Sequence, residues 1–167
     1  GTFLISGNNI TQEANGGRGI IINNGTISKT SDGLSSFRYM NGFDNLNTIN
    51  VNSGTLELYF ATLNNTGSLV LNSGTFNINS SAFNNNTGGV VTGTGIINNN
   101  GTINNNGIVA PGQPIGLLTS TGNQILSGSS DLRIELNDGL PAGTGYDQLV
   151  RNGDLTLAGT LTISETG

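Results

Sequence analysis

The stretch Ile96–Gly112, IINNNGTINNNGIVAPG, decides the fold of this chain. Short apolar pairs alternate in it with asparagine runs, and the unit Asn-(Asn/Ser)-Gly-Thr-(Ile/Leu/Phe) is centred on Gly101. The same unit recurs around Gly25, Gly54 and Gly74, as NNGTI, NSGTL and NSGTF. A unit that returns every 20 to 29 residues is typical of stacked structural repeats.

The composition favours a thin core and frequent turns. Of the 167 residues, 34% are hydrophobic and 9% are charged, against about 45–50% and about 25% in ordinary globular domains. Glycine and asparagine, with 27 residues each, fill much of the difference. Disordered chains are typically rich in charge and proline, whereas this one has few charges and 3 prolines. We therefore expect a folded all-β chain.

Between the repeats, apolar residues fall on alternate positions, which places one face of each strand in a core. The residues with this alternation are Ile49, Val51, Leu56, Leu58, Phe60, Leu69, Leu71, Phe76 and Ile78. The acidic residues Glu57, Asp131 and Glu135 fall on outward positions, where we expect solvated charges. No stretch has a 3.6-residue period long enough for a helix.

Strands joined in parallel by short turns coil into a solenoid, in which each coil buries its inner face against the next one. We expect residues 1–167 to form one β-solenoid domain of about seven coils. Residues 1–106 carry the Asn/Gly-rich repeats. An antiparallel meander is the alternative, because Asn-Gly is also the usual hairpin turn, but the near-identical spaced units favour coiling.

The repeat units are expected to supply the turns between strands. Asparagine tolerates left-handed backbone angles, stacked asparagines form hydrogen-bonded ladders, and glycine supplies positive φ. The residues assigned to turns and ladders are Asn24, Gly25, Asn52, Gly54, Asn72, Gly74, Asn100 and Gly101.

Within the stretch Ile96–Gly112, the apolar residues are expected to fill the core and the asparagines to turn the chain. The expected core residues are Ile96 or Ile97, Ile103 and Ile108. The expected turns are Asn98–Asn100 and Asn104–Asn106.

The segment Ser31–Asn45, SDGLSSFRYMNGFDN, differs from the repeats in composition. We interpret it as an excursion, either a protruding loop or a segment packed over an end of the fold. Its side chains Phe37, Arg38, Tyr39 and Phe43 are candidate partner contacts, because exposed aromatic residues with arginine are common at contact surfaces. The alternative is that Phe37 and Tyr39 point into the core.

Residues 107–167 resemble the distal passenger repeats of bacterial autotransporter-type surface proteins. The resemblance lies in Pro111-Gly112 with Gly116, the strand Leu132–Leu136, Tyr146-Asp147-Gln148-Leu149 and Gly159-Thr160-Leu161. It implies a right-handed parallel β-helix that is exported, extended and non-enzymatic.

The sequence indicates no catalytic residues, no metal site and no cofactor. It contains no His and no Cys, and its acids include no adjacent Asp-Asp pair. Asp147 is expected to accept backbone N–H bonds in its turn. The five cations are scattered along a chain of net charge -5, which argues against nucleic acid. No apolar run approaches the roughly 20 residues of a membrane span.

Three functions follow as hypotheses. The first is an extracellular structural rod of the bacterial cell surface, which adheres, stacks on neighbouring domains or assembles with itself end to end, because unpaired strand edges at the rod ends are templates for pairing. The second is a module that binds surface glycans through Phe37, Tyr39 and Phe43. The third is a polysaccharide-degrading enzyme, which requires a groove with two suitably spaced carboxylates.

Overall fold

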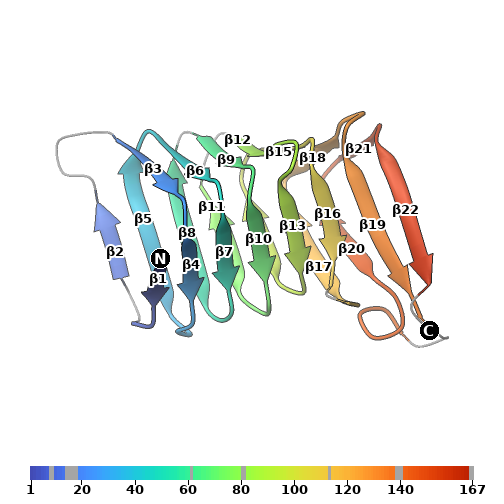
Figure 1. Ribbon diagram of the computed structural model, residues 1–167, viewed down its shortest axis with the longest axis horizontal. Helices are drawn as coiled ribbons and strands as arrows, with labels where there is room; N and C mark the ends of the chain where they lie inside the picture. Colours follow the sequence, from blue (N-terminus) through green and yellow to red (C-terminus); the bar gives the residue numbers. More distant parts are fainter. Residues whose placement is uncertain are drawn as a thin grey trace.

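The protein is a parallel β-helix, as the repeats predict, and its coils wind with the right hand that the resemblance implies (Figure 1). The computed structural model describes residues 1–7, 10–13, 19–60, 62–79, 82–112, 114–137 and 141–165. These ranges contain 22 strands and no helix. Each strand pairs in parallel with the strand three places further along the chain, so the strands form three sheets around one long axis.

Each coil contributes one strand to each sheet, and the sheets contain eight, seven and seven of the described strands. The first sheet consists of β1 (Thr2–Ile5), β4 (Thr26–Lys29), β7 (Thr48–Val51), β10 (Ser68–Leu71), β13 (Val90–Gly93), β16 (Ile108–Pro111), β19 (Asp131–Leu136) and β22 (Thr160–Glu165). The second consists of β2 (Ile10–Glu13), β5 (Leu34–Met40), β8 (Thr55–Phe60), β11 (Thr75–Ile78), β14 (Ile96–Asn99), β17 (Leu117–Thr121) and β20 (Gln148–Asn152). The third consists of β3 (Ile20–Asn23), β6 (Gly42–Asn45), β9 (Thr62–Asn65), β12 (Ala82–Asn85), β15 (Thr102–Asn105), β18 (Asn123–Leu126) and β21 (Leu155–Leu157).

The core is a set of columns that run along the axis, because in-register pairing places like residues above one another. In the first sheet one such column consists of Ile27, Ile49, Leu69, Val91 and Val109, all buried. The alternation predicted from the sequence is confirmed at every expected core position between Ile49 and Ile78 whose side chain the structure describes; the side chain of Phe60 lies outside that part.

The stretch Ile96–Gly112 was only partly interpreted correctly. Ile97 and Ile103 are buried as expected, whereas Ile96 is 41% exposed. Ile108 faces outward, and its neighbour Val109 occupies the core column in its place. The inward and outward positions of β16 are therefore exchanged relative to the expectation.

The asparagines of this stretch do not all lie in turns. Asn98 and Asn99 belong to β14, and Asn104 and Asn105 belong to β15. Asn99 and Asn105 are buried, so the core accepts asparagine. The expectation that every asparagine run is a turn fails for that reason, and the bends between strands are only two residues long.

The repeat unit serves all three corners of the solenoid. Its threonines begin strands of different sheets: Thr26 begins β4 in the first, Thr55 and Thr75 begin β8 and β11 in the second, and Thr102 begins β15 in the third. Only the second and third units therefore lie directly above one another. There Asn72 Nδ2 donates to Asn52 Oδ1.

The glycines of the repeat serve mainly to let successive coils approach closely. Of these four glycines, only Gly54 has positive φ, at 63°. A Cβ at Gly25 would lie 2.3 Å from the backbone oxygen of Gly1, and one at Gly74 would lie 2.5 Å from Val51 Cγ1. A side chain at either position would force the coils apart.

A buried asparagine ladder runs along the end of the third sheet. It consists of Asn23, Asn45, Asn65, Asn85 and Asn105, one from each of five successive coils. Each Nδ2 donates to the Oδ1 of the next asparagine towards the C-terminus, over 2.5–2.7 Å. The column then continues with Leu126, so the ladder ends where the distal segment begins.

A second ladder lies on the outer face of the same strands. It consists of Asp44, Asn64, Asn84 and Asn104. Each asparagine donates to the preceding residue, with Nδ2–Oδ1 distances of 2.9–3.0 Å. Its hydrogen bonds therefore run in the opposite direction to those of the buried ladder.

The segment Ser31–Asn45 is not an excursion. It contains β5 and β6, which pair in parallel with the coils on either side. The segment departs from the regular pairing only at a register shift between Arg38 and Met40, where one extra residue is accommodated.

Candidate functional site

Two of the four predicted contact residues belong to the core. Phe43 is fully buried, and its ring lies edge-on to that of Phe37 at a centroid distance of 6.2 Å. Phe37 is half-buried and also meets Phe3, again at 6.2 Å. The prediction of Phe43 as a partner contact is wrong, because its position in β6 faces inward.

Tyr39 is the residue that the bulge in β5 presents to solvent. Its φ is 60°, and it is the only non-glycine residue with positive φ among the described residues. Holding a bulky residue in this region costs about 1–3 kcal/mol. The side chain is 56% exposed, and bulges commonly re-aim a side chain in this way.

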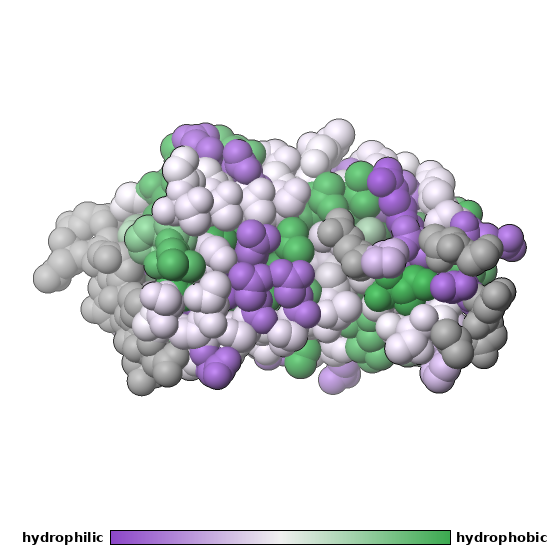
Figure 2. All heavy atoms as spheres, turned by 60° about the horizontal axis from the view of Figure 1, so that its bottom comes forward, coloured by the Kyte–Doolittle hydropathy of each residue, from purple (hydrophilic) through white to green (hydrophobic). Residues whose placement is uncertain are grey.

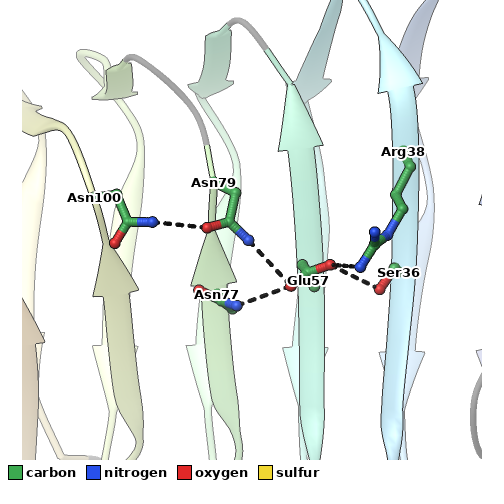
Figure 3. A network of polar contacts seen from close by, with 6 residues as sticks. All are labelled: Ser36, Arg38, Glu57, Asn77, Asn79 and Asn100. Atoms are coloured by element: carbon green, nitrogen blue, oxygen red, sulfur yellow. Dashed lines mark hydrogen bonds and ion pairs between the residues drawn. The ribbon is translucent and has the colours of Figure 1, made fainter.

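Beside the bulge, a polar network covers the outer face of the second sheet (Figure 3). Its centre is Glu57 in β8, whose Oε1 accepts hydrogen bonds from Ser36 Oγ at 3.0 Å and Arg38 Nη2 at 2.5 Å. Its Oε2 accepts from the Nδ2 atoms of Asn77 and Asn79, both at 3.0 Å. Four donors from two neighbouring coils therefore share one carboxylate.

Glu57 is consequently a structural anion. It is buried, which corrects the expectation of a solvated charge at this outward position. With both oxygens occupied by donors, it has no free lone pair aimed at solvent for proton transfer. The network continues to the next coil, where Asn100 Nδ2 donates to Asn79 Oδ1 at 2.8 Å.

Two exposed tyrosines, Tyr39 and Tyr59, lie beside this network. Arg38 lies over the ring of Tyr59, with its guanidinium carbon 5.6 Å from the ring centroid, which is within cation–π range. Tyr59 comes from β8 and Tyr39 from the neighbouring β5, and both are exposed. No local sequence pattern marks Tyr59 as a site residue; its place opposite Arg38 follows from the parallel register of the two coils.

A pocket of about 250 Å³ lies at the distal corner, lined by Ala110, Pro111, Gly112, Pro114, Arg133, Glu135 and Asp147. Asp147 is buried, and its oxygens accept backbone N–H bonds from Gly116 at 2.8 Å and Glu135 at 2.9 Å. Burial raises the pKa of Asp147, which those two hydrogen bonds oppose. The prediction that Asp147 accepts backbone N–H bonds is confirmed, but its placement of the donors in the turn of Asp147 is wrong, because they lie 31 and 12 residues away in the sequence.

The C-terminal end of the solenoid exposes residues that belong to a core. Leu157, Leu161 and Ile163 continue the inward columns but are 65%, 58% and 57% exposed. Leu126, directly preceding Leu157 in its column, is 1% exposed. The outer edges of the strands that carry them pair with no described strand.

The N-terminal end also opens onto the core among the described residues. Phe3 heads the first column of the first sheet and is 55% exposed. An apolar pocket of about 230 Å³ lies there, lined by Phe3, Ile21, Ile22, Asn23, Ile27 and Phe37. As far as the described residues show, both ends of the rod thus offer an apolar surface bounded by strand edges.

No group of three or more acidic, His or Cys side chains gathers as a metal site within the described ranges. In the same ranges, no helix has the length and apolar character to cross a membrane. In comparisons with protein-family models, curated proteins and solved structures, nothing matches this chain. The features of the structure that bear on function are therefore the two rod ends and the surface formed by Tyr39 and Tyr59.

Proposed function

We propose that this chain is a non-enzymatic, extracellular structural protein of the bacterial surface, and that it assembles end to end into filaments. The observation that carries the proposal is the exposed core surface of the last coil. Leu157, Leu161 and Ile163 stand in inward columns. Leu126, which precedes Leu157, is buried, and Leu132 and Ile134, which precede Leu161 and Ile163, are half-buried. A surface of this kind is stabilised by one more coil.

The energetics favour covering both ends. Burying one leucine or isoleucine side chain fully is worth about 1.5–3 kcal/mol, so the three residues of the last coil supply several kcal/mol. Pairing the open edges of β20, β21 and β22 satisfies backbone groups in addition. These gains must exceed a cost of association of roughly 4–15 kcal/mol, which the apolar N-terminal end of a partner helps to offset.

A second copy of the chain is the occupant that fits. Its first coil presents the opposite edges of the same three sheets, and coil-on-coil parallel pairing is the interaction that already joins all three sheets. On the face shown in Figure 2, near-neutral residues lie between separate apolar and polar clusters.

Lysine substitutions at the last coil test the proposal. Leu157→Lys with Leu161→Lys is expected to abolish filaments in electron micrographs and to leave a monomer in sedimentation velocity. Both side chains are exposed, so folding should be retained. The matched control is Ile125→Lys, which charges an exposed isoleucine on the side wall and should leave assembly intact. Wild-type protein that stays monomeric at high concentration would refute the proposal.

The extracellular bacterial location is supported by composition and by the resemblance of residues 107–167 to surface-protein repeats. The chain has no Cys and few charges, and its turns are rich in asparagine. Detection of the intact protein on unpermeabilised cells by an antibody against the rod would test this part of the proposal.

A second candidate function, binding of surface glycans, is favoured by one observation. Tyr39 is held exposed at a costly backbone angle, beside Tyr59 and Arg38. Aromatic rings with flanking polar groups suit the apolar faces and hydroxyls of sugars. Tyr39→Ala with Tyr59→Ala should abolish retention on a glycan array, whereas Tyr146→Ala, which removes an exposed tyrosine elsewhere, should not.

A further inference from the structure

The open edges at the C-terminal end occur in a fixed order. The last three strands are β20 in the second sheet, β21 in the third and β22 in the first. A chain that continued the same winding would place its next strand on β20, the following one on β21 and the third on β22. The next free position therefore lies on the second sheet.

A second copy begins with β1, β2 and β3, which belong to its first, second and third sheets in that order. Because both copies wind with the same hand, β1 continues the winding only when it lies on β20 of the preceding copy. We infer that successive copies stack with a rotation of one third of a turn about the long axis, so that β1, β2 and β3 pair with β20, β21 and β22. This inference rests on the end-to-end assembly proposed above.

The two other orientations leave strand edges unpaired. If β1 lay on β22, with no rotation, β2 and β3 would each sit one coil too far from β20 and β21. The result is a gap of about one strand spacing, ~4.8 Å, in two of the three sheets. Rotation by one third of a turn in the opposite sense leaves such a gap in one sheet. Buried backbone groups without partners are costly, so the gap-free orientation is favoured.

Side chains are compatible with the gap-free orientation. It places the inward residues of β1, Phe3 and Ile5, on the inward positions Leu149 and Arg151 of β20. Arg151 directs its guanidinium back into its own chain, where it donates to Ser120 Oγ and to the backbone oxygen of Gly122. The guanidinium is thereby directed away from the position of Ile5, which is itself only 2% exposed.

The inference sets the symmetry of the filament. The 22 described strands, three to a coil, correspond to a rise of about 35 Å per copy at ~4.8 Å per coil. Three copies complete one turn of the subunit rotation. Helical reconstruction of filaments by electron microscopy should give this rise with a rotation near one third of a turn, beyond whatever twist the coils add. Filaments whose successive copies lack this rotation would overturn the inference; the gaps of the unrotated stack would increase the rise to about 38 Å per copy at ~4.8 Å per coil.

Cysteine cross-linking separates the three orientations in solution, because the chain itself contains no Cys. Leu4 is exposed on the outer face of β1. Its counterpart is Val150 in the inferred stack, Thr162 without rotation and Thr156 with the opposite rotation. Neighbouring strands bring Cα atoms to about 4.8 Å, within the range that a disulfide needs.

Three double variants are compared under mild oxidation: Leu4→Cys with Val150→Cys, with Thr156→Cys and with Thr162→Cys. The first should give a ladder of disulfide-linked multimers on a non-reducing gel, and the other two should give little. Preferential cross-linking through Thr162→Cys or Thr156→Cys would overturn the rotation while leaving end-to-end assembly in place. Absence of cross-links in all three, together with a monomer in sedimentation, would refute both.

Discussion

Lys29 places a charged side chain at an inward position of the core. It lies in β4 within the inward column between Ile5 and Val51, and its side chain is fully buried. Its Nζ donates to the backbone oxygen of Ser31 and to Ser31 Oγ. Burial lowers the pKa of Lys29, and the nearby Asp32 carboxylate opposes this effect.

The lowered pKa predicts an alkaline gain in stability. The unfolded chain, with a lysine pKa of about 10.4, holds its proton to higher pH than the folded chain does. The free energy of unfolding should therefore rise as pH increases from the folded pKa of Lys29 to about 10.4. Lys29→Met should remove this rise and stabilise the protein near neutral pH by of the order of 1 kcal/mol.

Urea denaturation at a series of pH values measures this effect. Arg133→Met is the matched control, because it removes an exposed cation from the surface. It should leave the alkaline rise unchanged. A rise that persists in Lys29→Met would show that another group is responsible.

Glu57 illustrates the opposite case, a buried anion fully supplied with donors. In Glu57→Gln the amide nitrogen would face donors already aimed at an acceptor, and Arg38 would lose its anion. Unfolding free energy should fall by about 2 kcal/mol, less than for a deeply buried pair, since Arg38 is one third exposed. Asp44→Asn, which keeps an acceptor for Asn64, should change it by less than about 0.5 kcal/mol. Equal losses in the two variants would contradict the role of Glu57.

At the scale of elements, the buried ladder and the outer ladder offer a direct comparison. Asn65 and Asn64 are neighbours in β9, with Asn65 buried and Asn64 half-buried. Asn65→Ala leaves Asn85 Oδ1 without its donor in the core and should cost about 1–3 kcal/mol. Asn64→Ala breaks an equivalent pair of bonds where water can replace them, and should cost a few tenths of a kcal/mol.

Thermal unfolding of the two single variants distinguishes these cases. Both remove the same atoms from the same strand, so strand propensity cancels between them. A loss in Asn64→Ala as large as that in Asn65→Ala would mean that the ladders stabilise the coils irrespective of burial.

The sequence predicts the strands of this fold better than it predicts its corners. The alternation of apolar and polar residues around Ile49, Val51 and Leu56 identifies the inward faces of these strands, because the core excludes charged side chains at those positions. The repeat unit misleads at the corners, because Asn-Gly-Thr suits any tight bend and so marks all three. The sequence signal for the buried ladder is that asparagine recurs every 20 residues from Asn45 to Asn105. The other asparagines of the repeat units obscure this signal.

The surface around Tyr39 could be located from the sequence only in outline. Its aromatic composition marked the segment, but Phe37 and Phe43 face inward, whereas Tyr39 faces outward because it is the extra residue in β5. A bulge is set by pairing with the neighbouring coil, so no local pattern encodes it. The partner Tyr59 lies a coil away and becomes a neighbour only through the parallel register.

At the scale of the whole molecule, the proposed assembly depends on apolar ends. Assembly through such ends should strengthen in sulfate, which promotes burial of apolar surface, and should persist in high sodium chloride. Assembly through charged side walls would weaken in sodium chloride instead. Sedimentation velocity in the two salts, with Leu157→Lys and Leu161→Lys as the control, measures the difference.

The two asparagine ladders of the third sheet have an electrical consequence. In the buried ladder every side-chain amide donates towards the C-terminus, and in the outer ladder every one donates towards the N-terminus. Their dipoles oppose one another, and sheets themselves contribute little net dipole. The two ends of the rod therefore differ chemically, but these ladders contribute little net dipole along its axis. Filaments lying side by side would meet little electrostatic bias from this source, whether they run in the same or in opposite directions.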